Sequence, residues 1–98
     1  MSDPSLEEVI LQRLRGVIDP ETQTDVVRMR LVENVWADAL GKVRYTFRPS
    51  SLVCPIAVSL AMDIKKAVAE VPGVIAQEIA VEGYLMAEDL EKLINQET

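Results

Sequence analysis

The 98-residue sequence contains no histidine and only one cysteine, Cys54. Without histidine, the chain has no Ser-His-Asp triad, no Cys-His nucleophile pair and no histidine general base. A zinc site built from histidine ligands is excluded for the same reason. A single cysteine cannot form an intramolecular disulfide, so the fold is not a disulfide-stapled scaffold, and a reducing cytoplasmic location is expected.

Long apolar runs are also missing. The longest is interrupted by Asp63, Lys65 and Lys66, and none approaches the roughly 20 residues that a membrane helix needs. The first five residues contain no basic segment followed by an apolar one, which argues against a secretory signal. We therefore expect a soluble protein with a single domain over residues 1–98 and no membrane partner.

Basic residues are the minority, because ten lysines and arginines stand against sixteen acids, for a net charge of −6. This balance disfavours a nucleic-acid partner. The bases gather in residues 26–66, where seven bases and three acids give +4, whereas residues 1–25 (two bases, six acids) carry −4 and residues 67–98 (one base, seven acids) carry −6. Cys54 lies in the basic third, whose field would favour a thiolate. The same charges are also typical of a solvated sheet face.

The apolar spacing predicts a first helix over about residues 4–15, with two competing starts. Asp3 precedes a proline, as an N-cap often does, and Ser5 with Glu8 forms a capping box one turn later. Residues 17–25 follow no period and are rich in turn-forming residues, which predicts a loop.

Two strands joined by a short hairpin loop are predicted next, over Leu31–Ala37 and Lys42–Arg48. The second alternates apolar residues with lysine, arginine and threonine, so one face is expected to be buried and the other cationic. Trp36 is expected to pack within the hairpin rather than to stack on bases.

The remaining pattern predicts a second helix over about residues 54–70, a third strand over Val74–Glu82 and a short last helix over about residues 86–95. The strand is expected to bury Ile75, Ile79 and Val81, and the last helix to pack through Met86, Leu90, Leu93 and Ile94. The resulting order is helix, strand, strand, helix, strand, helix. It predicts a two-layer α+β sandwich with a mixed three-stranded sheet, in which the first two strands are antiparallel and the second and third are parallel.

Cys54 is the strongest candidate for chemistry in the sequence. Pro55 suits the first position of a helix, so Cys54 is expected at the N-cap, where the helix dipole would stabilise a thiolate. The alternative is a buried cysteine that acts as a small hydrophobe. Ser50 and Ser51 precede it and are suited to capping the helix or contacting a ligand, and Arg48 is included among the residues expected to line the site.

Asp19 and Glu21 flank a proline that stiffens their segment. Paired carboxylates in a loop are usually solvated, which is the simpler interpretation of this pair. One thiol and scattered carboxylates cannot complete a four-coordinate site for a soft metal in one chain. Any metal or cluster would need ligands from a second subunit, a partner protein or a small thiol.

Four motifs occur in a specific order: Asp19-Pro20-Glu21 after the first helix, Leu31-Val32 at a strand start, Pro49-Ser50 ahead of Cys54-Pro55, and Val71-Pro72-Gly73-Val74 before the last strand. In this order and spacing, over residues 6–83, the chain resembles the SufT/PaaD-like family of small metal–sulfur cluster assembly domains. It departs from the family at Arg30, where relatives usually carry a glycine before the Leu-Val pair.

The resemblance implies an α+β domain that assists the maturation of iron–sulfur proteins as a carrier, adaptor or targeting factor. The family's reactive thiol falls on Cys54, its acidic loop pair on Asp19 and Glu21, and its hydroxyl pair on Ser50 and Ser51. Cys54 would then contribute one ligand to a transient iron–sulfur cluster or iron. The implied partners are iron–sulfur assembly proteins or apo-protein clients, and a homodimer is compatible with the sequence.

Two other function classes compete with this interpretation. The first is a protein-binding module of a larger complex, such as an oxygenase, in which the thiol is incidental and no metal is involved. The second is a thiol-nucleophile enzyme such as a thiol transferase. It is disfavoured, because the chain offers no histidine as base and no second cysteine to resolve an intermediate. We therefore expect a non-enzyme.

Overall fold

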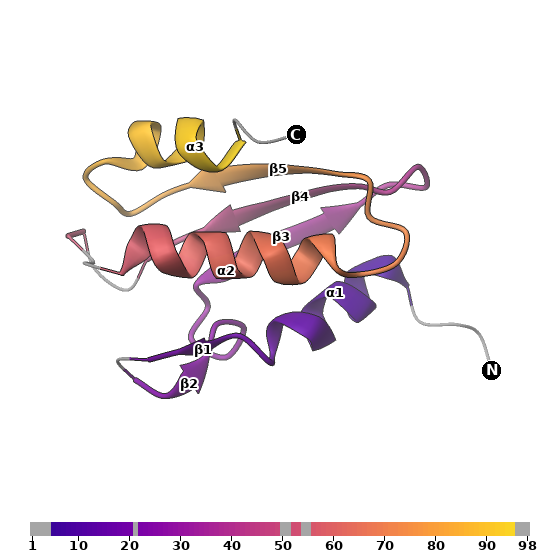
Figure 1. The fold of residues 1–98 in the computed structure, drawn as a ribbon, viewed down its shortest axis with the longest axis horizontal. Coiled ribbons are helices and arrows are strands. Elements are labelled where there is room, and N and C mark those ends of the chain that lie inside the picture. Colours follow the sequence, from indigo (N-terminus) through magenta and orange to yellow (C-terminus); the bar gives the residue numbers. More distant parts are fainter. Residues whose placement is uncertain (1–4, 21, 50–51, 54–55, 96–98) are drawn as a thin grey trace.

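The structure is a computed structural model that describes residues 5–20, 22–49, 52–53 and 56–95. Three helices and five strands follow one another in these residues (Figure 1). Their order is α1 (Leu6–Leu14), β1 (Ile18–Asp19), β2 (Thr24–Asp25), β3 (Val32–Ala37), β4 (Lys42–Phe47), α2 (Ala57–Ala69), β5 (Ala76–Val81) and α3 (Ala87–Asn95).

Helix α1 starts at the second of the two predicted N-caps. The Ser5 side chain accepts a hydrogen bond from the Glu8 backbone N–H at 3.2 Å, which satisfies one of the amides that a helix start leaves unpaired. Asp3, the competing N-cap, lies outside the described residues. Ile10 and Leu14, one turn apart, are fully buried, as the predicted apolar stripe requires.

The main sheet has the strand order β3-β4-β5. Strands β3 and β4 are antiparallel, and β4 and β5 are parallel, with Tyr45 opposite Ile79. The predicted mixed three-stranded sheet is therefore confirmed, and the strand order, which the pattern left open, puts β4 in the centre. Between Glu33 and Trp36 the register of β3 shifts at a bulge, where Asn34 has a φ of +57°.

The helices line one face and both edges of this sheet. Helix α2 crosses the face, α1 lies beside β3, and α3 runs along β5 (Figure 1). The core forms between α2 and the sheet, where Val43 and Phe47 of β4 and Leu60, Ile64 and Val68 of α2 are buried. This arrangement confirms the predicted α+β sandwich, to which the short pair β1-β2 adds a second, two-stranded sheet.

A buried polar chain ties β4, β5 and α2 together. The Tyr45 hydroxyl donates to Gln77 Oε1 at 2.8 Å, and Gln77 Nε2 donates to the Lys65 carbonyl at 2.9 Å. Burial raises the pKa of the Tyr45 hydroxyl well above its ordinary value, so the group stays a neutral donor. Gln77 is the one polar residue among the inward positions of β5, and both the oxygen and the nitrogen of its side-chain amide are hydrogen-bonded.

Side chains from the helices cover both open edges of the sheet. From α3, the Asn95 amide accepts from Ile79 N at 2.9 Å and donates to Ile79 O at 2.8 Å, and Glu91 Oε2 accepts from Val81 N at 2.8 Å. At the other edge, Glu7 Oε2 accepts from Ala37 N at 2.9 Å. Because these bonds occupy edge amides, they hinder the addition of a further strand.

Three residues that were predicted to lie in the core are exposed instead. Ile75 is 74% exposed, because β5 begins only at Ala76 and the Ile75 N–H donates to the Gly41 carbonyl outside the sheet ladder. Met86 and Leu93 are also exposed, whereas Leu90 and Ile94 are buried. Since α3 lies along an edge rather than across a face, it buries only a narrow stripe.

Candidate functional site

Strands β1 and β2 form a small hairpin near the start of α2 (Figure 1). The predicted loop over residues 17–25 therefore contains a short antiparallel ladder, with Ile18 opposite Asp25 and Asp19 opposite Thr24. The Gln23 N–H donates to the Asp19 carbonyl at 2.7 Å and closes the turn, and Gln23 itself has a φ of +58°. Two-residue strands are too short for alternation to be recognised in the sequence.

Asp19 is fully buried in this hairpin, although a loop carboxylate was expected to be solvated. Its neighbour along the chain, Ile18, is exposed, so the hairpin turns its acid inward and its apolar residue outward. Moving a carboxyl group from water into the protein interior costs free energy, so a buried carboxyl group usually has a structural or functional role. Asp19 is thus the outstanding site candidate among the described residues.

A small cavity of about 60 Å³ separates this hairpin from the first two turns of α2. Pro20 lines it from the hairpin, and Ile56, Ser59, Leu60 and Asp63 line it from the helix. The turn that follows Asp19 therefore packs beside the start of α2. The structure brings together the acidic motif and the helix that follows the cysteine motif, as one site requires.

Helix α2 begins at Ala57, and its N-cap is Ile56, whose φ and ψ are −107° and 12°. The expectation that Cys54 occupies the N-cap is therefore wrong, because the helix starts later than the proline suggested. Among the described residues no side chain caps this terminus, and the first turn of α2 holds no acidic residue. The amides and the positive end of the dipole at a helix start attract an anionic group.

Four predicted site residues lie outside the described residues: Glu21, Ser50, Ser51 and Cys54. Arg48 is described, just beyond the end of β4. Its guanidinium pairs with Glu33 at 3.6 Å and with Glu82 at 3.1 Å, so two carboxylates offset its charge. Arg48 is thereby tied to β3 and to the end of β5, whereas Asp19 lies in the β1-β2 hairpin.

Trp36 packs across the hairpin as expected but not in the core. The residue is 48% exposed, and the guanidinium carbon of Arg44, its partner on β4, lies 5.7 Å from the ring centroid. Arg44 in turn pairs with Glu78 of β5 at 3.3 Å. The outward face of β4 is therefore covered by ion pairs, and the cationic face predicted from the sequence is largely neutralised.

Sequence reasoning missed a group of exposed apolar residues near the start of α2. Leu52 and Val53 precede the cysteine motif, and Leu85 and Met86 follow β5. The two segments meet where the Leu85 N–H donates to the Leu52 carbonyl at 2.9 Å. For Leu52, Val53 and Leu85 the available signal was their hydrophobicity outside every predicted helix and strand, whereas Met86 was assigned to the last helix.

Within residues 5–20, 22–49, 52–53 and 56–95, no group of three or more histidine, cysteine, aspartate or glutamate side chains is placed to hold a metal ion. None of the helices in these ranges is both long and apolar enough to cross a membrane.

Two proteins similar to this chain carry names from iron–sulfur protein maturation. The chain is 34% identical over 79 residues to the Fe-S protein maturation auxiliary factor YitW of Bacillus subtilis, covering 81% of this chain and 78% of that protein. It is 35% identical over 74 residues to an iron-sulfur cluster carrier protein of Synechocystis, covering 76% of this chain but 21% of the carrier. The chain thus corresponds to about a fifth of that longer protein.

The fold has a close counterpart among solved structures. A domain of unknown function from Bacillus anthracis superposes with a TM-score of 0.72 at 30% sequence identity, covering 91% of this chain and 87% of that one. Residues 7–81 match the family described as iron-sulfur cluster assembly protein. This match confirms the resemblance drawn from the four motifs: the chain belongs to the iron–sulfur cluster assembly protein family.

Proposed function

We propose that this protein is a cytoplasmic iron–sulfur maturation factor that carries a transient cluster, or iron, on the thiolate of Cys54. The observation that carries the proposal is the fully buried Asp19, whose neighbour Pro20 lines one cavity with Ile56 at the start of α2. Cys54 precedes Ile56 by two residues in the sequence. The names of the relatives, a maturation factor and a cluster carrier, support the same role.

Each group at this end of the molecule has a distinct task in the proposal. The N-terminal amides of α2 would favour the anionic form of the thiol that precedes the helix in the sequence and so make it a better ligand. Asp19 fixes the hairpin beside the helix start, while Glu21, Ser50 and Ser51 line the entrance to the site. No step requires covalent catalysis, because the cluster is cargo that passes from one set of ligands to another.

A lone thiol can hold a cluster only by sharing it. The remaining ligands come from an assembly protein, an apo-protein client, a small thiol or a second copy of the chain. A shared cluster has a practical consequence: each transfer is a ligand exchange between two proteins, so the carrier needs a surface on which its partner can dock.

The role of the thiol is tested by measuring how well the Cys54→Ser variant, in place of the parent chain, activates an apo-protein client. We expect this variant to lose cluster-dependent activation while its circular dichroism spectrum and melting curve stay those of the parent. Full activation by Cys54→Ser would contradict the ligand role. It would support the rival function, an adaptor that brings proteins together without holding the cluster.

The role of Asp19 is tested separately with a matched pair of variants on the same hairpin. Asp19→Asn replaces the buried carboxyl group by an amide, whereas Asp25→Asn alters a less buried residue whose side chain accepts from Arg28 N at 2.8 Å. We expect Asp19→Asn to slow client activation about tenfold or more, a barrier increase of about 1.4 kcal/mol. Asp25→Asn should leave the rate unchanged, and equal effects would assign the hairpin a purely structural role.

A further inference from the structure

Six large apolar side chains are exposed around the start of α2 and the end of β5, and we call them the end surface. They are Leu52 (56% exposed), Val53 (68%), Val58 (44%), Met62 (44%), Leu85 (71%) and Met86 (58%). Isolated exposed hydrophobic residues are common on proteins and need no explanation, but a contiguous group usually marks an interaction site.

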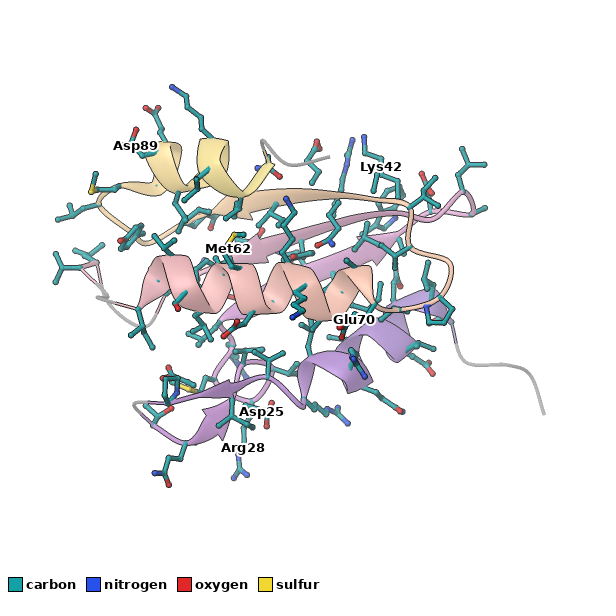
Figure 2. The ribbon with its side chains drawn as sticks, viewed as in Figure 1. Asp25, Arg28, Lys42, Met62, Glu70 and Asp89 are labelled. Carbon is teal, nitrogen blue, oxygen red and sulfur yellow. The ribbon has the colours of Figure 1, made fainter. Side chains whose placement is uncertain are left out.

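Several observations connect these residues. The hydrogen bond from Leu85 N to Leu52 O joins the two loops. Val58 and Met62 lie one turn apart on α2, and Figure 2 shows Met62 pointing from α2 towards β5 and α3. Tyr84 and Ala87, on either side of the Leu85-Met86 pair, pack against the core and hold that pair at the surface.

The charges beside the end surface indicate what kind of partner fits it. Glu88 and Asp89 follow Met86 directly, in the first turn of α3, and Asp89 projects away from the molecule in Figure 2. Neither acid forms an ion pair within the part of the chain that the structure describes. A second copy docked on this surface would bring like charges together, whereas a basic partner would neutralise them.

We propose that the end surface binds a segment of a partner protein that presents apolar side chains flanked by lysine or arginine. The inference rests on the proposed function for its biological setting, because Leu52 and Val53 immediately precede Cys54 in the sequence. Two of the six side chains are methionines, whose flexible thioethers adapt to differently shaped partners. One surface can thereby serve more than one client.

The probe for this surface is a pair of synthetic amphipathic peptides with the same leucine face, one carrying lysines at both ends and the other glutamates. Calorimetry with the full chain measures both affinities, and amide shifts of the ¹⁵N-labelled chain locate the contact. We expect the lysine peptide to bind about tenfold or more tightly than the glutamate peptide. The shifted amides should be those of residues 52–53, 58, 62 and 85–86.

Neutral substitutions separate the apolar contribution from the electrostatic one. The double variant Leu85→Ser, Met86→Ser keeps the net charge and should weaken binding of the lysine peptide about tenfold or more. Leu40→Ser is the matched control, because Leu40 is 78% exposed but lies in the β3-β4 hairpin, and it should bind like the parent. Glu88→Gln with Asp89→Asn should weaken binding about fivefold and reduce its salt dependence.

Three results would overturn the proposal. These are equal affinity for the two peptides, shifts confined to residues outside the end surface, and an equal loss in Leu40→Ser. Sedimentation that reveals a dimer broken by Leu85→Ser, Met86→Ser would also overturn it and assign the surface to a second copy. Cys54→Ser should bind the lysine peptide like the parent, so failure of the docking surface and failure of the thiol's role are distinguishable.

Discussion

The β3-β4 hairpin and the opposite end of the molecule, where α2 begins, use their residues for different purposes. In the hairpin, Asp38 Oδ1 accepts from Leu40 N and Lys42 N, both at 2.9 Å, and the Gly41 carbonyl accepts from Ile75 N. Around the start of α2 lie the buried Asp19 carboxyl group, a helix terminus that no described side chain caps, and the end surface.

This contrast separates stability from function. The hairpin end satisfies its polar groups locally and brings Gly41 close to Gly73, although Leu40 and Ile75 are exposed there. The other end gathers six exposed apolar side chains on the end surface and buries the Asp19 carboxyl group, features that are typical of interaction sites. Variants at the hairpin end should therefore change the free energy of unfolding, and variants at the other end should change cluster transfer.

The largest expected effect belongs to Gly41→Ala. A Cβ at this position, where φ is +96°, would lie 2.1 Å from the Gly73 carbonyl oxygen. Backbone strain and overpacking together should lower the free energy of unfolding by about 3 kcal/mol or more, measured by urea denaturation. Client activation per folded molecule should be unchanged. A loss of activation without a loss of stability would contradict the claim that the hairpin end affects stability alone.

Gly73→Ala is the control for this variant. Gly73 has a similar φ of +98°, but the nearest atom to an added Cβ is Leu6 Cδ1 at 3.8 Å. The cost should be about 1 kcal/mol, from backbone strain alone. Equal losses in the two variants would show that the contact between Gly41 and Gly73 is not the cause.

An intermediate effect is expected at the covered edge of β5, the strand that runs between the two ends. Asn95→Ala removes both amide contacts to Ile79 and leaves its backbone N–H and carbonyl without those partners. The free energy of unfolding should fall by about 2 kcal/mol. Lys92→Ala, an exposed position of the same helix, should change it by less than about 0.5 kcal/mol, and a similar loss there would point to a general effect of α3.

A pH-dependent effect is expected at the hairpin end. The hydrogen bond from Lys42 N, aided by that from Leu40 N, holds the pKa of the Asp38 carboxyl below its ordinary value. A lowered pKa stabilises the folded chain at neutral pH, and this contribution disappears as the pH falls through the ordinary and then the folded pKa.

The pH effect is measured by comparing Asp38→Asn with the parent chain. Between about pH 5 and pH 3, the parent should lose more stability than Asp38→Asn, followed by thermal melts at each pH. Asp89→Asn, an exposed acid of α3, controls for the loss of one negative charge. Parallel pH curves for the parent and Asp38→Asn would contradict the assignment of Asp38.

The smallest effect is a gain, at the point where the chain departs from the family pattern. Arg30 has a φ of +59°, a conformation that glycine adopts freely and a residue with a Cβ does not. Arg30→Gly should raise the free energy of unfolding by about 0.5–1 kcal/mol. Arg30→Ala retains the Cβ and should give no gain, so stabilisation by both variants would locate the effect in the loss of the arginine side chain.

The sequence predicted the elements whose residues interact locally. The alternation along Lys42–Arg48 identified β4 and its buried face, because each residue of a central strand has a fixed orientation. The same alternation failed at Ile75, since the start of β5 depends on how Gly41 meets the segment after α2. That contact joins residues far apart in the chain, and no local pattern encodes it.

Prediction of the site was less complete. The motifs singled out Asp19, but its burial depends on a hairpin whose strands have two residues each, too few for a period. The proline after Cys54 suggested a helix start that the structure has at Ile56 and Ala57. The end surface escaped notice because exposure of an apolar residue depends on what packs over it, which the sequence does not state.

The most direct test of the account is anaerobic reconstitution of the full chain with iron and sulfide in the presence of a small thiol, followed by visible absorption and by transfer to an apo-protein. We predict that the parent chain acquires sulfur-to-iron absorption and passes the cluster on, and that Cys54→Ser does neither. Identical absorption and transfer in Cys54→Ser would contradict the claim that this thiol holds the cluster.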